Sequence, residues 1–445
     1  MTSTSSNTPA SNDDIPASEM PAAPKARVQT FRALRYRNFR FLWISLIVSS
    51  VGTWMQIIAQ SLLVLLITHG SALALGIVSL AQASSFFLFA LVGGSVADRV
   101  DKRRFLLLTQ SLSMLLAFVL GTLTITGVIQ VWMIVLLAFA SGTVLSFDQP
   151  TRSSFIPMLV PRQDLMNAIS LQSIVFNGSA VLGPTLAGVT IGLLAYAGQA
   201  VGLTSKLVGY AGNFYLNGVS YMGVLVVLSL IQVPKDAAEQ ATEKRGPMLQ
   251  SIRMALGAVR RDAVLPWVLS GYGALLFFGP SSALILPIFA TQILHLSPFQ
   301  LGLLFSASGL GVITGSLIVA SLGDFQYKGW LLLISLLFWT GALVIFALSR
   351  VLWLSLLALL IFGVAQNGVG ATVITLAQTR VPPQMRGRVM SLNTLLIMGV
   401  RPLGDFPASG LIALAGGPLT VIICAAIVGS YSLYLLLGRS IIRSL

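Results

Sequence analysis

Charged residues and cysteine are scarce in this chain. Only 9% of its 445 residues are Asp, Glu, Lys or Arg, whereas 56% are hydrophobic. Soluble domains carry about 25% charged residues, so a water-exposed surface could not be covered by so few ionic groups. The single cysteine, Cys424, excludes a disulfide within the chain. The composition therefore excludes a soluble domain or a disulfide-stapled secreted one, and it predicts a protein that crosses a membrane many times.

Common catalytic and nucleotide-binding motifs are also missing. The sequence contains no Gly-x-Ser-x-Gly, no His-Glu-x-x-His and no P-loop. Its two histidines, His69 and His295, are too isolated to predict a metal site. We expect neither an enzyme nor a bound cofactor. Energy for any work across the membrane must then come from an ion gradient or from the gradient of a substrate.

Long apolar runs divide the chain. Because a helix needs about 20 residues to cross the hydrocarbon layer, the runs predict twelve spans, at 41–67, 72–97, 105–126, 131–148, 165–195, 208–233, 264–292, 299–322, 330–348, 351–376, 389–414 and 417–438. This pattern predicts a disordered cytosolic tail (1–30), a six-helix bundle (31–233), a cytoplasmic linker (234–263), a second six-helix bundle (264–438) and a short cytoplasmic tail (439–445).

The positive residues indicate the orientation. Of 27 Lys and Arg, all lie on one side of the predicted membrane except Lys206, Arg350 and Arg401. Basic residues near span ends stay in the cytoplasm during insertion, so both termini are predicted to be cytoplasmic. The net charge of +14 is thereby explained by topology, and nucleic acid is not an expected partner. We expect a multi-pass protein of the plasma membrane, in bacteria the inner membrane.

A charged hairpin between the second and third spans occurs twice. Its residues are Gly94, Asp98, Arg99, Lys102 and Arg103, and a worn copy retains Asp324 and Lys328 at an offset of 226 residues. Other identities in the same register include His69 with His295 and Gly76 with Gly302. Duplicated halves are a common plan of secondary transporters, which place the substrate site between the halves. We expect the hairpin residues to form a cytoplasmic gate, although a simple excess of positive charge would explain the arginines alone.

A second loop pair supports the duplication. Val160-Pro161 matches Val381-Pro382 at an offset of 221, and the same register aligns Gly183 with Gly404. Before the first of these loops, Asp148 and Arg152 place an acid and a base at the end of the fourth span. We predict that Asp148 lies near Arg99 or Lys102 when the cytoplasmic side is closed.

Several strings resemble a known family. They are RNFRFLW at 37–43, GTWMQ at 52–56, GGSVADRVDKRR at 93–104, DQPTR at 148–152 and VPPQMRGRVM at 381–390. Together they resemble the major facilitator superfamily, and within it the enterobactin-exporter-like (transmembrane secretion effector) branch. The resemblance implies an all-α fold of twelve helices in two pseudo-symmetric six-helix bundles. It also implies export of small organic molecules, a siderophore or a drug-like amphiphile, by alternating access in a monomer.

The fifth span carries small residues at helical spacing. Ser179-x-x-x-Gly183-Pro184-x-x-Ala187-Gly188 is similar to the antiporter motif of exporter branches, with Ser and Ala in place of two glycines. Small residues four apart allow two helices to touch, and a proline bends the helix. We expect this segment to form a seam between the halves. Ordinary small-residue packing is the alternative.

Ionic residues inside the spans are few. Arg401 and Asp405 lie four residues apart in the eleventh predicted span. Because a charge at the bilayer centre costs at least about 2.5–3.5 kcal/mol, each needs a cavity or a partner. The pair either binds a charged substrate group or a proton, or neutralises itself. Further candidates for the cavity lining are polar residues of the first, fifth and tenth spans, namely Gln56, Gln60, Gln172, Asn177 and Asn367. Asn213 and Asn217, by contrast, are expected to join helices.

Two departures from the family limit these expectations. The second hairpin lacks the glycine and the arginine, so its gate should be weaker. The first span has no acid and the fourth has no arginine, so proton coupling rests on the resemblance alone. A lysophospholipid or lipid flippase, or a membrane sensor that transports nothing, remains an alternative to an exporter.

Overall fold

The computed structural model describes residues 31–97, 100–200, 207–231, 248–322, 326–382, 385, 389–390, 392–393, 396–438 and 442. Helices and short connections make up these residues. The N-terminal half contains the short 3-10 helix η1 (Arg32–Arg35) and helices α1 (Arg37–Ile67), α2 (Ala72–Ala97), α3 (Lys102–Ile125), α4 (Val131–Phe155), α5 (Leu165–Ala200) and α6 (Leu207–Leu230), with 3-10 turns η2 (Ile156–Met158) and η3 (Arg162–Asp164) between α4 and α5.

The C-terminal half follows the same plan with more interruptions. Its elements are α9 (Leu265–Phe278), α10 (Ser282–Ile288), the π-helix η4 (Phe289–Ile293), α11 (Pro298–Ser321), α12 (Lys328–Leu348), α13 (Leu352–Thr379), the π-helix η5 (Leu396–Val400), α15 (Arg401–Ala415) and α16 (Gly417–Gly438). Before them lies α8 (Met248–Arg261), within the segment expected to be a linker. Residues 1–30, 439–441 and 443–445, which were expected to belong to the two tails, lie outside the described residues.

Eleven of the described helices are long and apolar enough to cross a membrane, with α9, α10 and η4 forming one of them. The predicted span 389–414 is not among these eleven. Its described part consists of η5 and α15, and α15 has only 15 residues. A count of twelve spans and a cytoplasmic position for both termini therefore stay predictions.

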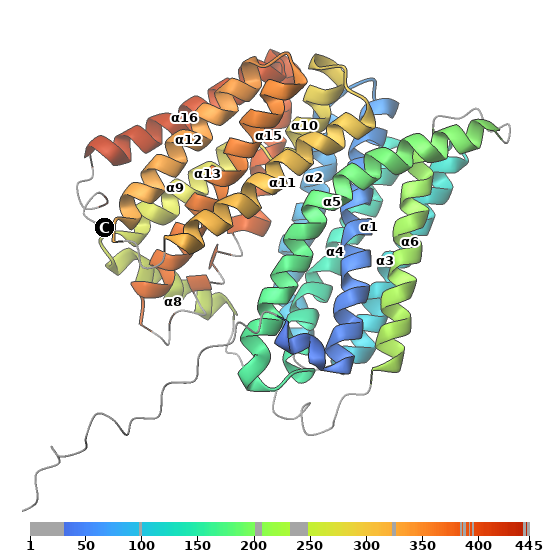
Figure 1. Cartoon of the computed structure of the whole chain (residues 1–445), viewed down its shortest axis with the longest axis horizontal. Helices are drawn as coiled ribbons and strands as arrows, with labels where there is room; N and C mark the ends of the chain where they lie inside the picture. The colour runs from blue at the N-terminus through green and yellow to red at the C-terminus, as the bar shows by residue number, and fades with distance from the viewer. Residues whose placement is uncertain are drawn as a thin grey trace, which may run out of the picture.

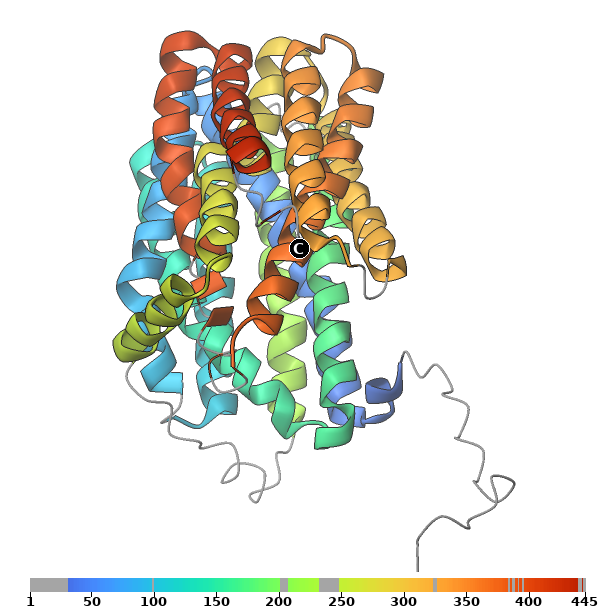
Figure 2. The same ribbon diagram turned by 90° about the vertical axis from the view of Figure 1, so that its left-hand side faces the viewer.

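The helices form two bundles that lie side by side (Figure 1). In the N-terminal bundle α2 packs on α4, α3 on α6, and α1 on both α5 and α6. In the C-terminal bundle α11 packs on α13, and α12 packs on α13 and α16. Viewed from the side of the C-terminal bundle, α16 stands in front of the helices of the N-terminal bundle (Figure 2). The bundles meet where α5 packs on α11, α2 on α15 and α1 on α10.

Matching residues of the two halves occupy matching places. A Cβ at Gly76 would lie 1.9 Å from Ser409 Oγ, and a Cβ at Gly302 would lie 2.6 Å from Thr185 Cα. The two glycines, aligned by the repeat, therefore each bring a helix of one bundle onto a helix of the other. His69 and His295 also share a backbone conformation, with φ of 52° and 49°. This left-handed region is uncommon for residues other than glycine, so the turns after α1 and η4 are built alike.

Contacts between the bundles gather at the predicted external end. Gln292 donates to the carbonyl of Gly70 at 2.6 Å, and the glycine contacts above lie in the first turns of α2 and α11. At the predicted cytoplasmic end, a separate apolar cluster contains residues of the N-terminal half only, among them Phe39, Phe155 and Leu228. The conformation is therefore closed at the predicted external end.

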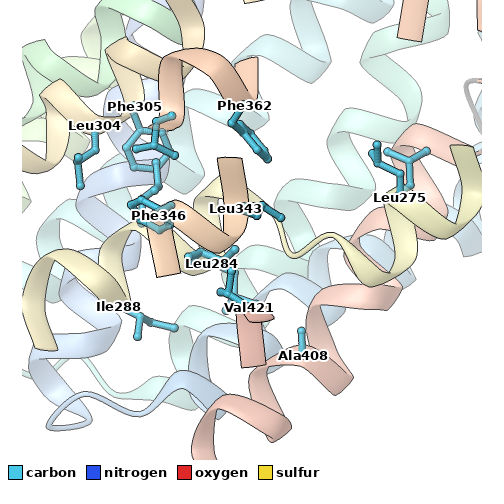
Figure 3. Packing of buried hydrophobic residues seen from close by; sticks show 14 of the residues in the cluster. Leu275, Leu284, Ile288, Leu304, Phe305, Leu343, Phe346, Phe362, Ala408 and Val421 are labelled. Atoms are coloured by element: carbon cyan, nitrogen blue, oxygen red, sulfur yellow. The ribbon is translucent and has the colours of Figure 1, made fainter. Parts of the chain in front are cut away.

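Aromatic and branched side chains fill the C-terminal bundle (Figure 3). Phe346 of α12 stacks on Phe289 with ring centroids 4.6 Å apart, and Trp339 packs on Phe362 of α13 at 5.6 Å. Leu284 and Ile288 of α10 lie in the same packed region, close to Val421 of α16. This core supports α10 from one side, and α1 contacts it from the N-terminal bundle.

A break separates α9 from α10. Gly279 ends α9 with ψ of 96°, Pro280 follows, and Ser281 starts α10 by accepting the backbone N–H of Leu284. A Cβ at Gly279 would lie 2.3 Å from the carbonyl oxygen of Leu275 and 2.7 Å from the ring of Trp339, so glycine is required here. Proline then lacks the N–H needed to continue the helix. The predicted continuous span 264–292 is thus two helical pieces.

Candidate functional site

The α5 motif lies in the seam between the bundles. A Cβ at Gly188 would lie 2.3 Å from the carbonyl oxygen of Pro298, at the start of α11. Ala187 is buried beside it, and the carbonyl of Pro184 contacts Gly302. On another face of α5, a Cβ at Gly183 would lie 2.5 Å from Trp54 Cβ of α1. The four motif residues Gly183, Pro184, Ala187 and Gly188 therefore allow α5 to pack closely on both its own bundle and the other one.

Hydroxyl groups add polar links to this seam. Thr185 Oγ1 and Ser306 Oγ lie 2.5 Å apart, and Thr185 also donates to the carbonyl of Gly302 at 3.2 Å. Ser306 donates to the carbonyl of Val181 at 2.7 Å. Each bond joins α5 to α11, so each must break if the external end opens.

Asp405 of α15 connects three elements at the second seam. Its carboxylate is 3% exposed and accepts the backbone N–H of Ser281 at 2.8 Å, where α10 begins. The hydroxyl of Ser79, on α2 of the other bundle, lies 3.5 Å from the other carboxylate oxygen. A carboxylate facing the first N–H groups of a helix is favourably placed. Asp405 thus ties α15 to both the break in α9–α10 and the N-terminal bundle.

Arg401 lies one turn before Asp405 but does not pair with it. Among the ion pairs of the described residues there is none between the two side chains, and Arg401 Nε is buried without a hydrogen-bond partner there. The rest of the side chain is half-buried. Gly399, two residues earlier in π-helix η5, is in close contact with the ring of Phe87 of α2. Arg401 therefore lies beside the seam, close enough to Asp405 to attract its carboxylate but without a direct ion pair in this conformation.

The polar candidates of the cavity lie in different surroundings. Gln56 accepts from Asn217 Nδ2 at 2.7 Å, which joins α1 to α6 within one bundle. Asn177 is exposed and donates to the carbonyl of Ser173 in its own helix. Gln60 of α1, Gln172 of α5 and Asn367 of α13 are half-buried. The side-chain oxygens of Gln172 and Asn367 are buried and have no hydrogen-bond partner among the described residues.

Interhelical bonds also involve the other asparagine expected to join helices. Asn213 Oδ1 accepts from Thr190 Oγ1 of α5 at 3.0 Å, and Asn213 itself is on α6. Both Asn213 and Asn217 thus link α6 to a neighbour. Gln56, predicted as a cavity residue, belongs to this group of links.

The residues expected at the cytoplasmic gate form local networks. Asp148 is 4% exposed, accepts from Thr109 at 2.9 Å and Gln110 at 2.7 Å, and pairs with Arg152 one turn later. Arg103 instead donates to the carbonyls of Leu228 and Ser229 at the end of α6. These contacts stay within the N-terminal bundle.

The remaining gate residues mark helix ends or lie outside the described residues. Lys102 begins α3 and is 8% exposed, and Lys328 begins α12. Gly94 belongs to the last turn of α2. Asp98, Arg99 and Asp324 lie outside the described residues. The proposed approach of Asp148 to Arg99 or Lys102 concerns the cytoplasm-closed conformation and stays a prediction.

One polar cluster was missed from the sequence. Asp164, 2% exposed, pairs with Arg32 and Arg35 at 2.8 Å each and accepts the hydroxyl of Tyr36 at 2.6 Å. The hydrogen bond from Tyr36, followed by the two arginines, lowers the pKa of Asp164 below its ordinary value. This cluster fastens η1 to the start of α5. An acid beside a loop proline and a basic segment just before the first span were the available signals.

Two helical bundles that meet through matched glycines and are closed at one end define a membrane transporter of the major facilitator type. Solved structures share this fold: a bacterial homolog of the lysosomal transporter Spinster, in an inward-facing and unoccupied conformation, has a TM-score of 0.68 and 14% identity, covering 91% of this chain and 96% of that one. The nucleoside transporter NupG has a TM-score of 0.68 and 13% identity, and the match covers 90% of this chain and 98% of that one. The chain belongs to the transmembrane secretion effector family, whose model matches residues 28–437.

Relatives within the family include exporters. The enterobactin exporter of Citrobacter koseri is 26% identical over 393 residues, 88% of each chain. An uncharacterised major facilitator transporter of Bacillus subtilis is 25% identical over 414 residues, 89% of this chain and 92% of that one. The staphyloferrin A transporter of Staphylococcus aureus is 30% identical over 142 residues, 32% of this chain and 36% of that one. The protein is thus a multi-pass transporter of the cell membrane.

Proposed function

We propose that this protein exports small organic molecules of the siderophore type by alternating access between the two bundles. The observation that carries the proposal is the seam: polar and small-residue contacts between α5 and α11, and between α2 and α15, close one end while the other end has a core of its own. Relatives that export enterobactin or transport staphyloferrin A support this class of cargo. The imperfect antiporter motif on α5 favours export over uptake.

A reversible crosslink across the seam tests alternating access. Thr185 and Ser306 face each other with oxygens 2.5 Å apart, close to the roughly 2.05 Å of a disulfide bond. In a background in which Cys424 is replaced by alanine, Thr185→Cys and Ser306→Cys should crosslink when oxidised. We expect oxidation to abolish enterobactin flux from proteoliposomes and a reductant to restore it, because the external end can no longer open.

The matched controls are the two single-cysteine variants in the same background, which oxidation should leave active. Full crosslinking with undiminished enterobactin flux would rule out opening at this seam. If the reduced protein transports neither enterobactin nor staphyloferrin A, the siderophore cargo is ruled out.

We propose in addition that the proton gradient drives export, with Asp405 as the proton-carrying group. The supporting observation is that this carboxylate lies buried at the seam, where it touches both bundles through Ser281 and Ser79. Asp405→Asn should then abolish transport driven by an imposed pH gradient while leaving counterflow of substrate down its own gradient. If pH-driven transport by Asp405→Asn equals that of the wild type, the proton role of Asp405 is wrong.

A further inference from the structure

Arg401 and Asp405 are spaced to form an ion pair, yet their side chains make no direct pair. Four residues apart on one helix, a cation and an anion are close enough to form an ion pair. Here the carboxylate is instead occupied by the N–H of Ser281 and the hydroxyl of Ser79. Arg401 is left with a buried Nε that has no acceptor among the described residues. A buried cationic donor without a partner is costly, so a permanent absence of any acceptor needs an explanation.

We propose that the substrate carries an anionic group which Arg401 binds, and that Ser281 keeps this site available by holding Asp405 away from Arg401. The inference rests on the transport function proposed above and specifies the cargo. Guanidinium is well suited to carboxylates and other planar or multidentate oxyanions. Arg401 is the binding residue, and Ser281 is a positioning residue that acts through Asp405.

An aromatic ring of the other bundle lies against a residue close to Arg401 along the chain. Phe87 of the other bundle lies against Gly399, two residues before Arg401, so closely that a Cβ at position 399 would lie 2.1 Å from the ring. A ligand held at Arg401 would therefore be near both bundles at the seam. Rings of this kind pack edge-to-face or offset against aromatic ligands.

The break before α10 explains how Asp405 is held. Ser281 has a free N–H because Pro280 and Gly279 end α9, and N–H groups at the start of a helix have no partner within the helix. Ser281 is also the N-cap of α10, through its side chain to Leu284. The hydroxyl of Ser281 also interacts with Asp405, so two substitutions are needed to separate the contribution of the backbone N–H from that of the side chain.

Ser281→Pro removes the N–H that Asp405 accepts, and Ser281 already has a φ of −66°, which proline adopts. Ser281→Ala removes only the hydroxyl and retains the N–H. The probes are 2,3-dihydroxybenzoate and its neutral amide, and the readout is the ratio of their dissociation constants for purified full-length protein. We expect the wild type and Ser281→Ala to prefer the anion, and Ser281→Pro to lose that preference because Asp405 turns to Arg401.

Two further variants exclude trivial outcomes. Arg401→Gln should reduce the anion preference by about tenfold or more, the range for a charge-assisted hydrogen bond, without changing affinity for the amide. Adding Asp405→Asn to Ser281→Pro should restore the preference, because no carboxylate then competes for Arg401; a misfolded protein would not recover. An unchanged ratio in Arg401→Gln, or no recovery in the double variant, would overturn the inference. The crosslinking experiment on Thr185 and Ser306 reports separately on transport itself.

Discussion

A single methyl group at Gly188 should push the two bundles apart. In Gly188→Ala the new Cβ would lie 2.3 Å from the carbonyl oxygen of Pro298 and 2.6 Å from Cα of Phe299, whereas ordinary contact begins at 3.4 Å. Both obstacles are backbone atoms, so no side-chain rotation can relieve the overlap. In an interior packed as densely as a crystal, α5 and α11 would have to separate by about 1 Å.

The magnitude follows from the cost of overpacking. Forcing extra carbon into a well-packed contact costs about 1–3 kcal/mol, and 1.4 kcal/mol corresponds to a tenfold change in an equilibrium constant. Gly188→Ala should therefore reduce the population closed at the external end by about 5- to 150-fold relative to open conformations. The bonds from Thr185 to Gly302 and Ser306 lie one turn away and should weaken with it.

Gly192→Ala is the matched control. It lies one turn later on the same helix, and nothing lies within 4 Å of its Cβ. Alanine is about 1 kcal/mol better than glycine inside a helix, so this change should be neutral or stabilising. The assay is the rate of disulfide formation between Thr185→Cys and Ser306→Cys in each background, with the melting temperature measured in parallel. Equal crosslinking rates and equal melting temperatures for the two alanine variants would refute the seam geometry.

Three further predictions concern the N-terminal half. Asp164→Asn should lower the melting temperature at neutral pH. Because the pKa of Asp164 is lowered in the folded protein, this difference should be constant above about pH 5 and shrink as the pH falls below about 4 and on through the folded pKa, and a difference that grows as the pH falls below about 4 would contradict it. Arg103→Gln should destabilise by about 1.5–3 kcal/mol through lost bonds to the end of α6, whereas Arg104→Gln should be neutral because Arg104 is 87% exposed; thermal unfolding distinguishes them. Alanine substitutions of Gln56 and Asn217 should show a coupling of about 0.6–1.7 kcal/mol in a double-mutant cycle, and additive effects would place Gln56 elsewhere.

The fold could be predicted well because its signals repeat. Apolar runs of membrane length and the recurrence of Gly76 as Gly302 both follow from the duplication, and the two glycines indeed contact opposite bundles. The eleventh predicted span was harder. Hydropathy averages over a window, so it does not report a π-turn such as η5 or a helix as short as α15.

The partners of the polar residues could not be predicted in the same way. Spacing of four residues offered a direct pair between Arg401 and Asp405 as one of two alternatives, and in the structure the carboxylate instead contacts Ser281. Likewise Gln56 lies on a helix expected to line the cavity and nevertheless bonds to α6. Such choices depend on where another helix ends. Gly279-Pro280 was a readable signal for that end, because this dipeptide marks turns and breaks.

The break at Gly279–Ser281 has no counterpart in the other copy. The aligned residues of the first half, Thr53 to Met55, lie in the middle of α1, which runs as one helix of 31 residues. Only the C-terminal copy of this helix therefore contains a break. When the external end opens, the bending should therefore occur at the break between α9 and α10, while the continuous helix α1 stays rigid beside it.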